Sequence, residues 1–216
     1  MTRADRGSGN MGIPAPPDSG HRKLRRLAVP AETSWYRIQD TGHPSALHFA
    51  KGSDARWNDP RGAYGVLYVA DRPETAFAET FGHGLMGGYP PAEDKFVGIE
   101  ELSERHIHRI RTTRALTLGL LHGPGLPALN LDARLLSTLD YGHPRAWSRW
   151  IFEAPDAPDG IRYPSRTLPG QDNTALFDRC RDALTEENLG PLATWRSDTG
   201  NLDIWDILDA QGWGLV

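Results

Sequence analysis

The residues of this chain that are best placed to do chemistry lie between Arg56 and Glu79. This stretch contains a cation in a turn, the aromatic hydroxyl of Tyr68 in an apolar run, and a carboxylate near the end of a helical pattern. A guanidinium pairs with phosphate groups, and a carboxylate accepts hydrogen bonds from sugar hydroxyls. We therefore expect the three side chains to converge on one pocket for a charged, planar ligand that carries sugar and phosphate.

Each of these residues also has a purely structural interpretation. An Arg in a turn such as Arg56-Trp57-Asn58 is usually a solvated charge, but the neighbouring Trp57 must be buried, which partly fixes the guanidinium. Tyr68 can be a core residue whose hydroxyl bonds to the backbone. Glu79 lies near the C-terminal end of its helix, where the helix dipole disfavours a carboxylate. That unfavourable position indicates a functional purpose.

A strand and the helix that follows it must position Tyr68 and Glu79. The continuous apolar run 66–70 predicts a strand that is covered on both faces. Asp71 then predicts the N-cap of a helix, with Glu74 completing a capping box and Pro73 in the first turn. The helix is expected to run to about Phe81 and to end at the glycines that follow it.

The remaining elements are short and do not alternate strictly between strand and helix. We expect strands at 33–39, 96–100, 106–111, 115–121, 161–165, 175–177 and 192–195, a further short strand candidate at 47–49, and helices at 132–139, 144–152 and 203–210. This mixture predicts an α+β domain with a mixed or antiparallel sheet and flanking helices. Residues 1–22, rich in Gly, Pro, Ser and charge, are expected to be a disordered tail before a single domain at 23–216.

Composition and charge exclude several classes of protein. The 216 residues suffice for one sizeable core, and 24 basic against 28 acidic residues give a net charge of −4, which argues against nucleic-acid binding. The basic residues at 22–26 are expected to be a solvated lead-in to the first strand. The sequence contains no run of about 18 apolar residues, so it predicts no membrane-spanning helix. The single Cys180 excludes an intramolecular disulfide and fits a reducing, cytoplasmic compartment.

Two further groups of residues are candidates for a metal site or a catalytic nucleophile. His106 and His108 would lie on one face of a strand, but no carboxylate or Cys at matching spacing completes a metal site, so we expect no metal. Ser165 ends a predicted strand and has no His-Asp pair to activate it. We therefore expect Ser165 to donate or accept hydrogen bonds rather than to attack a substrate.

Taken together, the ordered motifs resemble the RES domain. The segments that carry this resemblance are Trp35–Ile38, Arg56–Asn58, Tyr68, Pro73–Glu79 and Asp159–Arg166, and it extends over roughly residues 33–210. The family is named for its Arg, Glu and Ser and forms the toxin half of RES–Xre toxin–antitoxin pairs. The resemblance implies a fold similar to that of ADP-ribosyltransferase toxins, and a cytosolic enzyme that degrades NAD⁺.

The resemblance also implies roles for individual residues. The expected catalytic residues are Arg56, Glu79 and Ser165, which match the family's Arg, Glu and Ser. The expected substrate-binding residues are Tyr36, Arg37, Tyr68 and Arg166. One departure is the turn at 59–64, which is slightly longer than usual between the Arg and Tyr motifs. No cofactor is implied, since NAD⁺ is the substrate and inorganic phosphate a co-substrate.

The implied reaction breaks the bond between nicotinamide and ribose. Nicotinamide is a cationic leaving group that needs no general acid, so the site must stabilise an oxocarbenium-like ribose. In this interpretation Glu79 faces the ribose, Tyr68 packs on the nicotinamide or ribose, and Ser165 bonds the carboxamide or ribose. Arg37 and Arg56 neutralise the pyrophosphate or seat a phosphate nucleophile, which favours phosphorolysis over hydrolysis.

Two alternatives remain beside this interpretation. Transfer of ADP-ribose to a protein commonly needs a second carboxylate two residues before the catalytic Glu, where this chain has Phe77. A non-catalytic module that binds a nucleotide or an antitoxin is the other alternative. The implied partner is an Xre-type antitoxin, and a homodimer or a hetero-oligomer with it stays open. The apolar residues Trp205, Trp213, Leu215 and Val216 are candidates for such contacts or for the core.

Overall fold

An eight-stranded sheet forms the centre of the molecule, and the computed structural model describes residues 12–82 and 95–216. Its strands are β1 (Arg26–Val29), β2 (Ser34–Asp40), β3 (Val66–Ala70), β5 (Arg105–Thr112), β6 (Leu116–Leu120), β7 (Gly160–Pro164), β8 (Asp172–Phe177) and β9 (Leu184–Pro191). Their order is β1-β6-β7-β8-β3-β2-β5-β9, and β6 and β7 are the one parallel pair of this sheet within the described residues. The mixed sheet confirms the α+β class.

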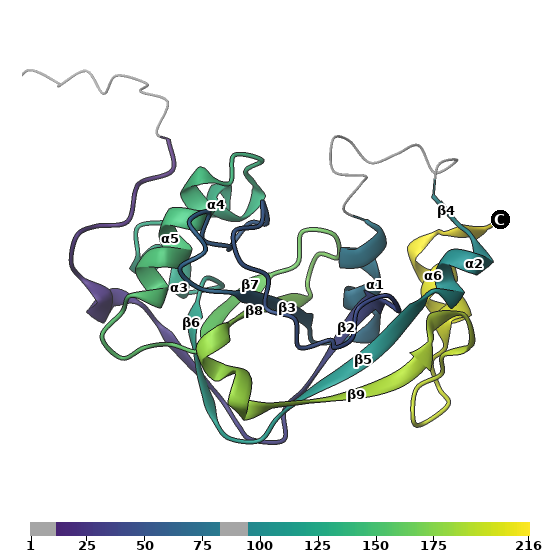
Figure 1. Cartoon of the computed structure of the whole chain (residues 1–216). Coiled ribbons are helices and arrows are strands. Elements are labelled where there is room, and N and C mark those ends of the chain that lie inside the picture. Colours follow the sequence, from purple (N-terminus) through teal and green to yellow (C-terminus); the bar gives the residue numbers. More distant parts are fainter. Residues whose placement is uncertain (1–11, 83–94) are drawn as a thin grey trace, which may run out of the picture.

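Short helices and a second, two-stranded sheet complete the fold (Figure 1). The helices are α1 (Pro73–Phe81), α2 (Ile99–Ser103), α3 (Gly125–Ala128), α4 (Arg134–Ser137), α5 (Gly142–Phe152) and α6 (Ile204–Gln211), with 3-10 turns η1 (His21–Lys23), η4 (Asp178–Ala183) and η5 (Leu192–Thr194). The small sheet pairs β4 (Phe96–Val97) with β10 (Gly214–Leu215) in parallel. In Figure 1, α3, α4 and α5 gather at one end of the large sheet, and α1, α2 and α6 at the other.

The large sheet is nearly divided between β2 and β3. These two strands share a single register pair, Tyr36 with Ala70, whereas β2 pairs with β5 from Ser34 to Asp40. Strand β3 is in turn paired with β8 along its whole length. Beyond the Tyr36–Ala70 pair the two halves of the sheet therefore diverge, and side chains can line the space between them.

The apolar core follows the same division. One cluster lies between α3–α5 and the β3, β7 and β8 strands, around Trp57, Tyr64 and Trp147. A second packs α1, α2 and α6 against β2 and β5, around Phe77 and Ile107. The remaining cluster covers the opposite face of the sheet with η4 and segment 46–49. Residues alternate between the faces of a strand, so Tyr68 and Ala70 share the helix-bearing face, where the first two clusters meet.

The strand and helix expected to position the site are present, with one correction at their junction. β3 spans the predicted residues, and α1 ends at Phe81 as expected. The N-cap is Arg72, which makes no side-chain cap bond, so the prediction of an Asp71–Glu74 capping box was wrong. The Asp71 carboxylate instead forms a two-point ion pair with Arg162 of β7. That charged partner outweighs a cap bond to a backbone N–H.

Other expected elements differ in type or length. The predicted strand at 96–100 is strand only at Phe96–Val97, because Gly98 serves as the N-cap of α2. The helix expected at 132–139 is the single turn α4, and the strand expected at 192–195 is the 3-10 turn η5. The strand candidate at 47–49 is not a strand, although Ala50 beside it forms one bridge to Val66.

Strands β1 and β9 were not predicted from the sequence. Both lie at the edges of the sheet and expose most of their side chains, so neither shows an apolar pattern of period two. The segment 83–94, which includes glycines expected to end the helix after Phe81, and residues 1–11 of the expected tail lie outside the described residues. In the described parts of the chain, no helix combines the length and apolar character needed to span a membrane.

Candidate active site

A pocket of about 450 Å³ lies where the two halves of the sheet diverge. It is lined by residues of β2, β3, α1, β7, β8 and the segments next to them: Tyr36, Arg37, Ile38, Ala55, Arg56, Tyr68, Val69, Ala70, Ala76, Glu79, Thr80, Tyr141, Tyr163, Arg166 and Asn173. The lining thus combines one carboxylate, three guanidiniums and four phenol rings. A space of this size and composition suits a small aromatic ligand with negative charge.

Glu79 is held in the pocket wall by three side-chain donors. Its Oε1 accepts hydrogen bonds from Ser165 Oγ at 2.6 Å, from Thr167 Oγ1 at 2.9 Å and from Asn173 Nδ2 at 2.7 Å. Ser165 is fixed in turn, since its Oγ accepts a bond from the Leu168 N–H. Hydrogen bonds to the charged form stabilise a carboxylate as an anion and fix its orientation.

Ser165 lies behind Glu79 rather than among the pocket-lining residues. It directly follows β7 and is buried, and its backbone N–H donates to the Gln171 carbonyl across the hairpin between β7 and β8. This placement agrees with a hydrogen-bonding Ser and opposes direct contact with a ligand. The other six predicted site residues all line the pocket.

Arg56 is anchored at the opposite wall by contacts from the α4–α5 region. Its Nη2 donates to the Thr138 carbonyl at 3.0 Å and its Nη1 to the Leu135 carbonyl at 3.4 Å, and its guanidinium lies 4.5 Å from the centre of the Tyr141 ring. The residue is buried, with 8% of its surface exposed, and burial lowers the pKa of its guanidinium. Carbonyls and a ring face neutralise little charge, so Arg56 remains available to an anion.

Tyr68 joins the central strand to the turn that carries Arg56. Its hydroxyl donates to Asn58 Oδ1 at 2.8 Å and accepts from the Trp57 N–H at 2.9 Å. Burial raises the pKa of Tyr68 far above the neutral range, so the hydroxyl stays protonated. Tyr68 therefore presents its ring to the pocket while its hydroxyl fixes the turn.

Arg37 and Arg166 are two further cationic residues of the pocket lining, and the alternation of β2 places the Arg37 side chain on the sheet face that carries Trp35. Arg37 Nε and Arg166 Nη1 are buried and find no hydrogen-bond partner among the described residues. No ion pair within the described residues includes either guanidinium, although Glu186 lies close enough to Arg37 to oppose the fall of its pKa on burial. Buried donors without partners are costly, and an anionic ligand would satisfy them.

The structure also brings in residues that sequence reasoning missed. Asn173 and Thr167 complete the shell around Glu79, and Tyr141 and Tyr163 add two aromatic walls. Tyr141 precedes α5 and reaches Arg56 from far along the chain, so no local pattern could reveal it. Asn173 is buried in the polar first half of β8, before the apolar residues 175–177 that predicted the strand, so no apolar pattern marked its position.

The histidine pair considered for a metal lies on β5, away from the pocket. His106 Nδ1 pairs with Asn188 Nδ2 at 2.9 Å, and the two rings are 6.4 Å apart. Within the described residues, no group of three or more His, Cys, Asp and Glu side chains is arranged to hold a metal ion.

Comparisons of the sequence with known proteins found one family and one curated relative. The family model described as "RES domain" matches residues 34–198, which include every predicted site residue. The chain is 30% identical over 119 residues to "Probable toxin y4kH" of Sinorhizobium fredii (strain NBRC 101917 / NGR234), a match that covers 55% of this chain and 88% of that protein.

A solved structure shares the fold. The crystal structure of the M. tuberculosis MbcT–MbcA toxin–antitoxin complex contains a chain that superposes with a TM-score of 0.54 at 17% identity. The superposition covers 76% of this chain and 87% of that one. The match of the family model over most of the chain, with the predicted motifs in order, decides the assignment: the chain belongs to the RES domain family.

Proposed function

We propose that this protein is the toxin of a toxin–antitoxin pair and that it depletes NAD⁺ by phosphorolysis of the nicotinamide–ribose bond. The observation that carries the proposal is a pocket lined by a fixed carboxylate and three arginines, two of which have a buried nitrogen without a hydrogen-bond partner in the described part of the chain. NAD⁺ offers a pyrophosphate, a ribose and a cationic ring to these groups. The similarity to a probable toxin and to a chain of a toxin–antitoxin complex supports the same class.

The proposed reaction requires no proton for the leaving group. The bond between ribose C1 and the nicotinamide nitrogen breaks, and its electron pair neutralises the pyridinium charge. A phosphate oxygen supplies the pair for the new C1–O bond, which gives nicotinamide and ADP-ribose-1″-phosphate. Glu79, held by Ser165, Thr167 and Asn173, stabilises the positive charge that develops on the ribose.

The arginines divide the negative charge in this proposal. Arg56 pairs with the pyrophosphate from the α4–α5 wall, while Arg37 and Arg166 hold phosphate oxygens from the sheet side. The rings of Tyr36 and Tyr68 provide flat surfaces for the nicotinamide or the ribose. Phosphorolysis is favoured over hydrolysis because the lining supplies cations beyond the one assigned to the pyrophosphate, and a water nucleophile would not need these additional cations.

Transfer of ADP-ribose to a protein is less well supported. Phe77 occupies the position two residues before Glu79, where such enzymes commonly carry a second carboxylate. Its side chain is fully buried, with its ring 5.6 Å from that of Trp213. The position therefore faces the core, and Glu79 is the one carboxylate among the pocket-lining residues that the structure describes.

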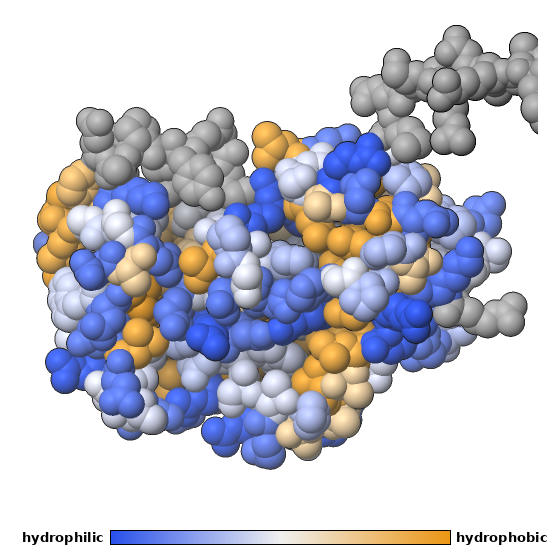
Figure 2. All heavy atoms as spheres, turned by 180° about the vertical axis from the view of Figure 1, so that it is seen from behind, coloured by the Kyte–Doolittle hydropathy of each residue, from blue (hydrophilic) through white to orange (hydrophobic). Residues whose placement is uncertain are grey.

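An antitoxin that blocks the pocket is the proposed partner, and action in the cytoplasm goes with it. Among the C-terminal residues considered for this contact or for self-association, Trp205, Leu215 and Val216 are exposed, whereas Trp213 packs on Phe77. Figure 2 shows apolar atoms reaching the surface on both sides of a hydrophilic centre. Exposed apolar groups of this kind are typical of contact surfaces.

A matched pair of variants tests the role of Glu79. Glu79→Gln keeps the shape of the side chain and removes its charge, so we expect NAD⁺ turnover to fall by about 100-fold or more. The control Glu74→Gln lies on the same helix, outside the pocket lining, and should keep full turnover. Circular dichroism and the melting temperature check that both variants fold. Normal NAD⁺ loss by folded Glu79→Gln would overturn the assignment.

A further inference from the structure

The first described residues of the chain lie outside the segment that matches the family model. Residues 12–26, here called the strap, lie along α5 and precede residue 34, where the family match begins. Trp147 Nε1 of α5 donates to the Pro14 carbonyl at 2.9 Å. Leu24 is buried in the cluster that contains Trp150 and Ile151. The strap is therefore fixed against one helix along its length.

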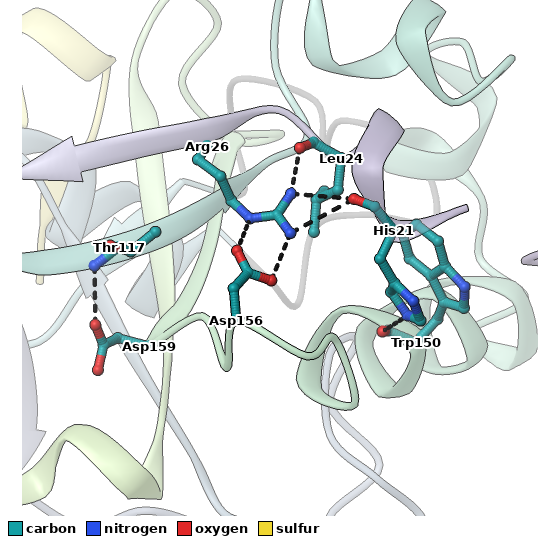
Figure 3. A network of polar contacts seen from close by, with 7 residues as sticks. All are labelled: His21, Leu24, Arg26, Thr117, Trp150, Asp156 and Asp159. Carbon is teal, nitrogen blue, oxygen red and sulfur yellow. Dashed lines mark hydrogen bonds and ion pairs between the residues drawn. The ribbon is translucent and has the colours of Figure 1, made fainter. Parts of the chain in front are cut away.

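The polar contacts of the strap reach the end of α5 and the turn beyond it (Figure 3). The His21 ring stacks on Trp150 with centroids 4.2 Å apart and planes inclined by 17°, and its Nε2 pairs with the Trp150 carbonyl at 2.9 Å. The Arg26 guanidinium donates hydrogen bonds to both carboxylate oxygens of Asp156, at 2.5 and 2.6 Å, and also to the Leu24 carbonyl. A bidentate pair of this kind fixes direction as well as distance.

The opposite face of α5 holds the turn that carries Arg56. Arg145 Nε donates to the Ala55 carbonyl at 3.2 Å, and Ser148 Oγ donates to the Trp57 carbonyl at 2.6 Å. Arg149 forms an ion pair with Asp59 at 3.2 Å. At 100° per residue, positions 145, 148 and 149 face away from positions 147, 150 and 151. Helix α5 thus lies between the strap and the Arg56 turn.

We propose that the strap positions Arg56 for anion binding by fixing α5 against the Arg56 turn. Among the described residues, the Arg56 guanidinium is held by two carbonyls and the Tyr141 ring, all on or near the α4–α5 segment, so a shift of α5 would displace it. Glu79 is held by Ser165, Thr167 and Asn173, none of which touches α5 through a hydrogen bond. Loss of the strap contacts therefore acts on ligand binding and spares the carboxylate.

The experiment uses the full chain and removes both polar anchors of the strap. His21→Ala combined with Arg26→Ala is expected to raise the KM for NAD⁺ by about tenfold with kcat within about twofold, since small displacements of a positioning group weaken its contact. Hydrogen exchange at amides 55–59 should rise. The variant His21→Phe with Arg26→Lys restores a stacked ring and a cation. Its KM for NAD⁺ should therefore lie close to that of the unaltered protein.

Controls separate a positioning role from a general loss of stability. Arg25→Ala removes an exposed cation from the same segment and should change neither KM nor exchange. A lower melting temperature with unchanged KM and unchanged exchange at 55–59 would overturn the proposal. A rise in KM accompanied by an equally large fall in kcat would also overturn it. If the double variant fails to fold, His21→Ala alone gives the same two measurements.

This inference rests on the proposed NAD⁺ reaction only for its kinetic measurement. If the unaltered protein leaves NAD⁺ intact, the proposed function fails, while exchange at 55–59 still decides whether the strap holds the turn. If NAD⁺ is consumed and the strap variants match Arg25→Ala in both measurements, the strap proposal fails and the proposed function stands.

Discussion

At the scale of residues, the orientation of one carboxylate explains most of the site. Glu79 lies near the C-terminal end of α1, where the dipole disfavours a negative charge. Three neutral donors compensate at Oε1, and they come from the end of β7, the hairpin after it and β8. The motif residues Glu79 and Ser165 could be singled out, because Glu79 lies in a recognisable helix and Ser165 follows a recognisable strand. Their direct hydrogen bond could not, since it joins distant parts of the chain.

Asn173 is the test of this shell at the residue scale. Asn173→Asp replaces the Nδ2 donor, 2.7 Å from Glu79, with a second carboxylate oxygen. A hydrogen bond to a charged group contributes about 1.5–3 kcal/mol, so we expect kcat to fall by about 10- to 100-fold. Asn188→Asp, at the exposed edge strand, is the matched control and should keep its kcat. Full activity of Asn173→Asp would show that Glu79 needs no such donor.

At the scale of elements, apolar periodicity predicted the central strands and the longer helices, while the edges of the sheet escaped it. The run at 66–70 was recognised as β3 because burial on both faces leaves a continuous apolar stretch. Strand β9 contains Thr185, Glu186, Glu187 and Asn188, and its place in the sheet comes from pairing with β5 alone. Backbone pairing of this kind leaves no mark in side-chain type.

The corrected end of β3 gives a prediction at the same scale. Arg162 joins β7 to Asp71 after β3 and to Asp172 at the start of β8, the residue before Asn173. Asp71→Ala leaves the half-buried guanidinium with one carboxylate partner, so the free energy of unfolding should fall by about 1–3 kcal/mol in urea denaturation. Asp198→Ala breaks an exposed pair with Arg109 and should cost under about 0.5 kcal/mol. Equal losses in the two variants would contradict this reading of the junction.

At the scale of the whole molecule, the divided sheet creates the pocket. The halves meet at Tyr36 and Ala70, and helices on the same face close the space from both ends. The α+β class could be predicted from the order of the elements. The division of the sheet between β2 and β3 could not, because the register of two paired strands cannot be predicted from one strand alone. The pocket is thus a property of pairing across the chain, even though its residues lie in local motifs.

Buried tyrosines make the stability of the whole molecule sensitive to alkaline pH. Burial raises the pKa values of Tyr64, Tyr68 and Tyr163 above the ordinary value of about 10. The unfolded chain therefore releases these protons first, so their contribution to stability is complete below about pH 10 and declines above it. Urea denaturation at several pH values between 9 and 11 should show this decline. A Tyr163→Phe variant should show a shallower decline, and an unchanged slope would argue that the hydroxyl is not shielded from solvent.

The most direct test of the central claim is the identity of the products. Purified protein, shown to be folded and free of antitoxin, is incubated with NAD⁺ in the presence and absence of inorganic phosphate, and the products are identified by mass spectrometry. We predict nicotinamide and ADP-ribose-1″-phosphate, formed only with phosphate. Free ADP-ribose in both samples would mean hydrolysis in place of phosphorolysis. It would also remove the proposed role of the arginines in holding a phosphate nucleophile. Intact NAD⁺ in both samples would contradict the account and favour a non-catalytic module.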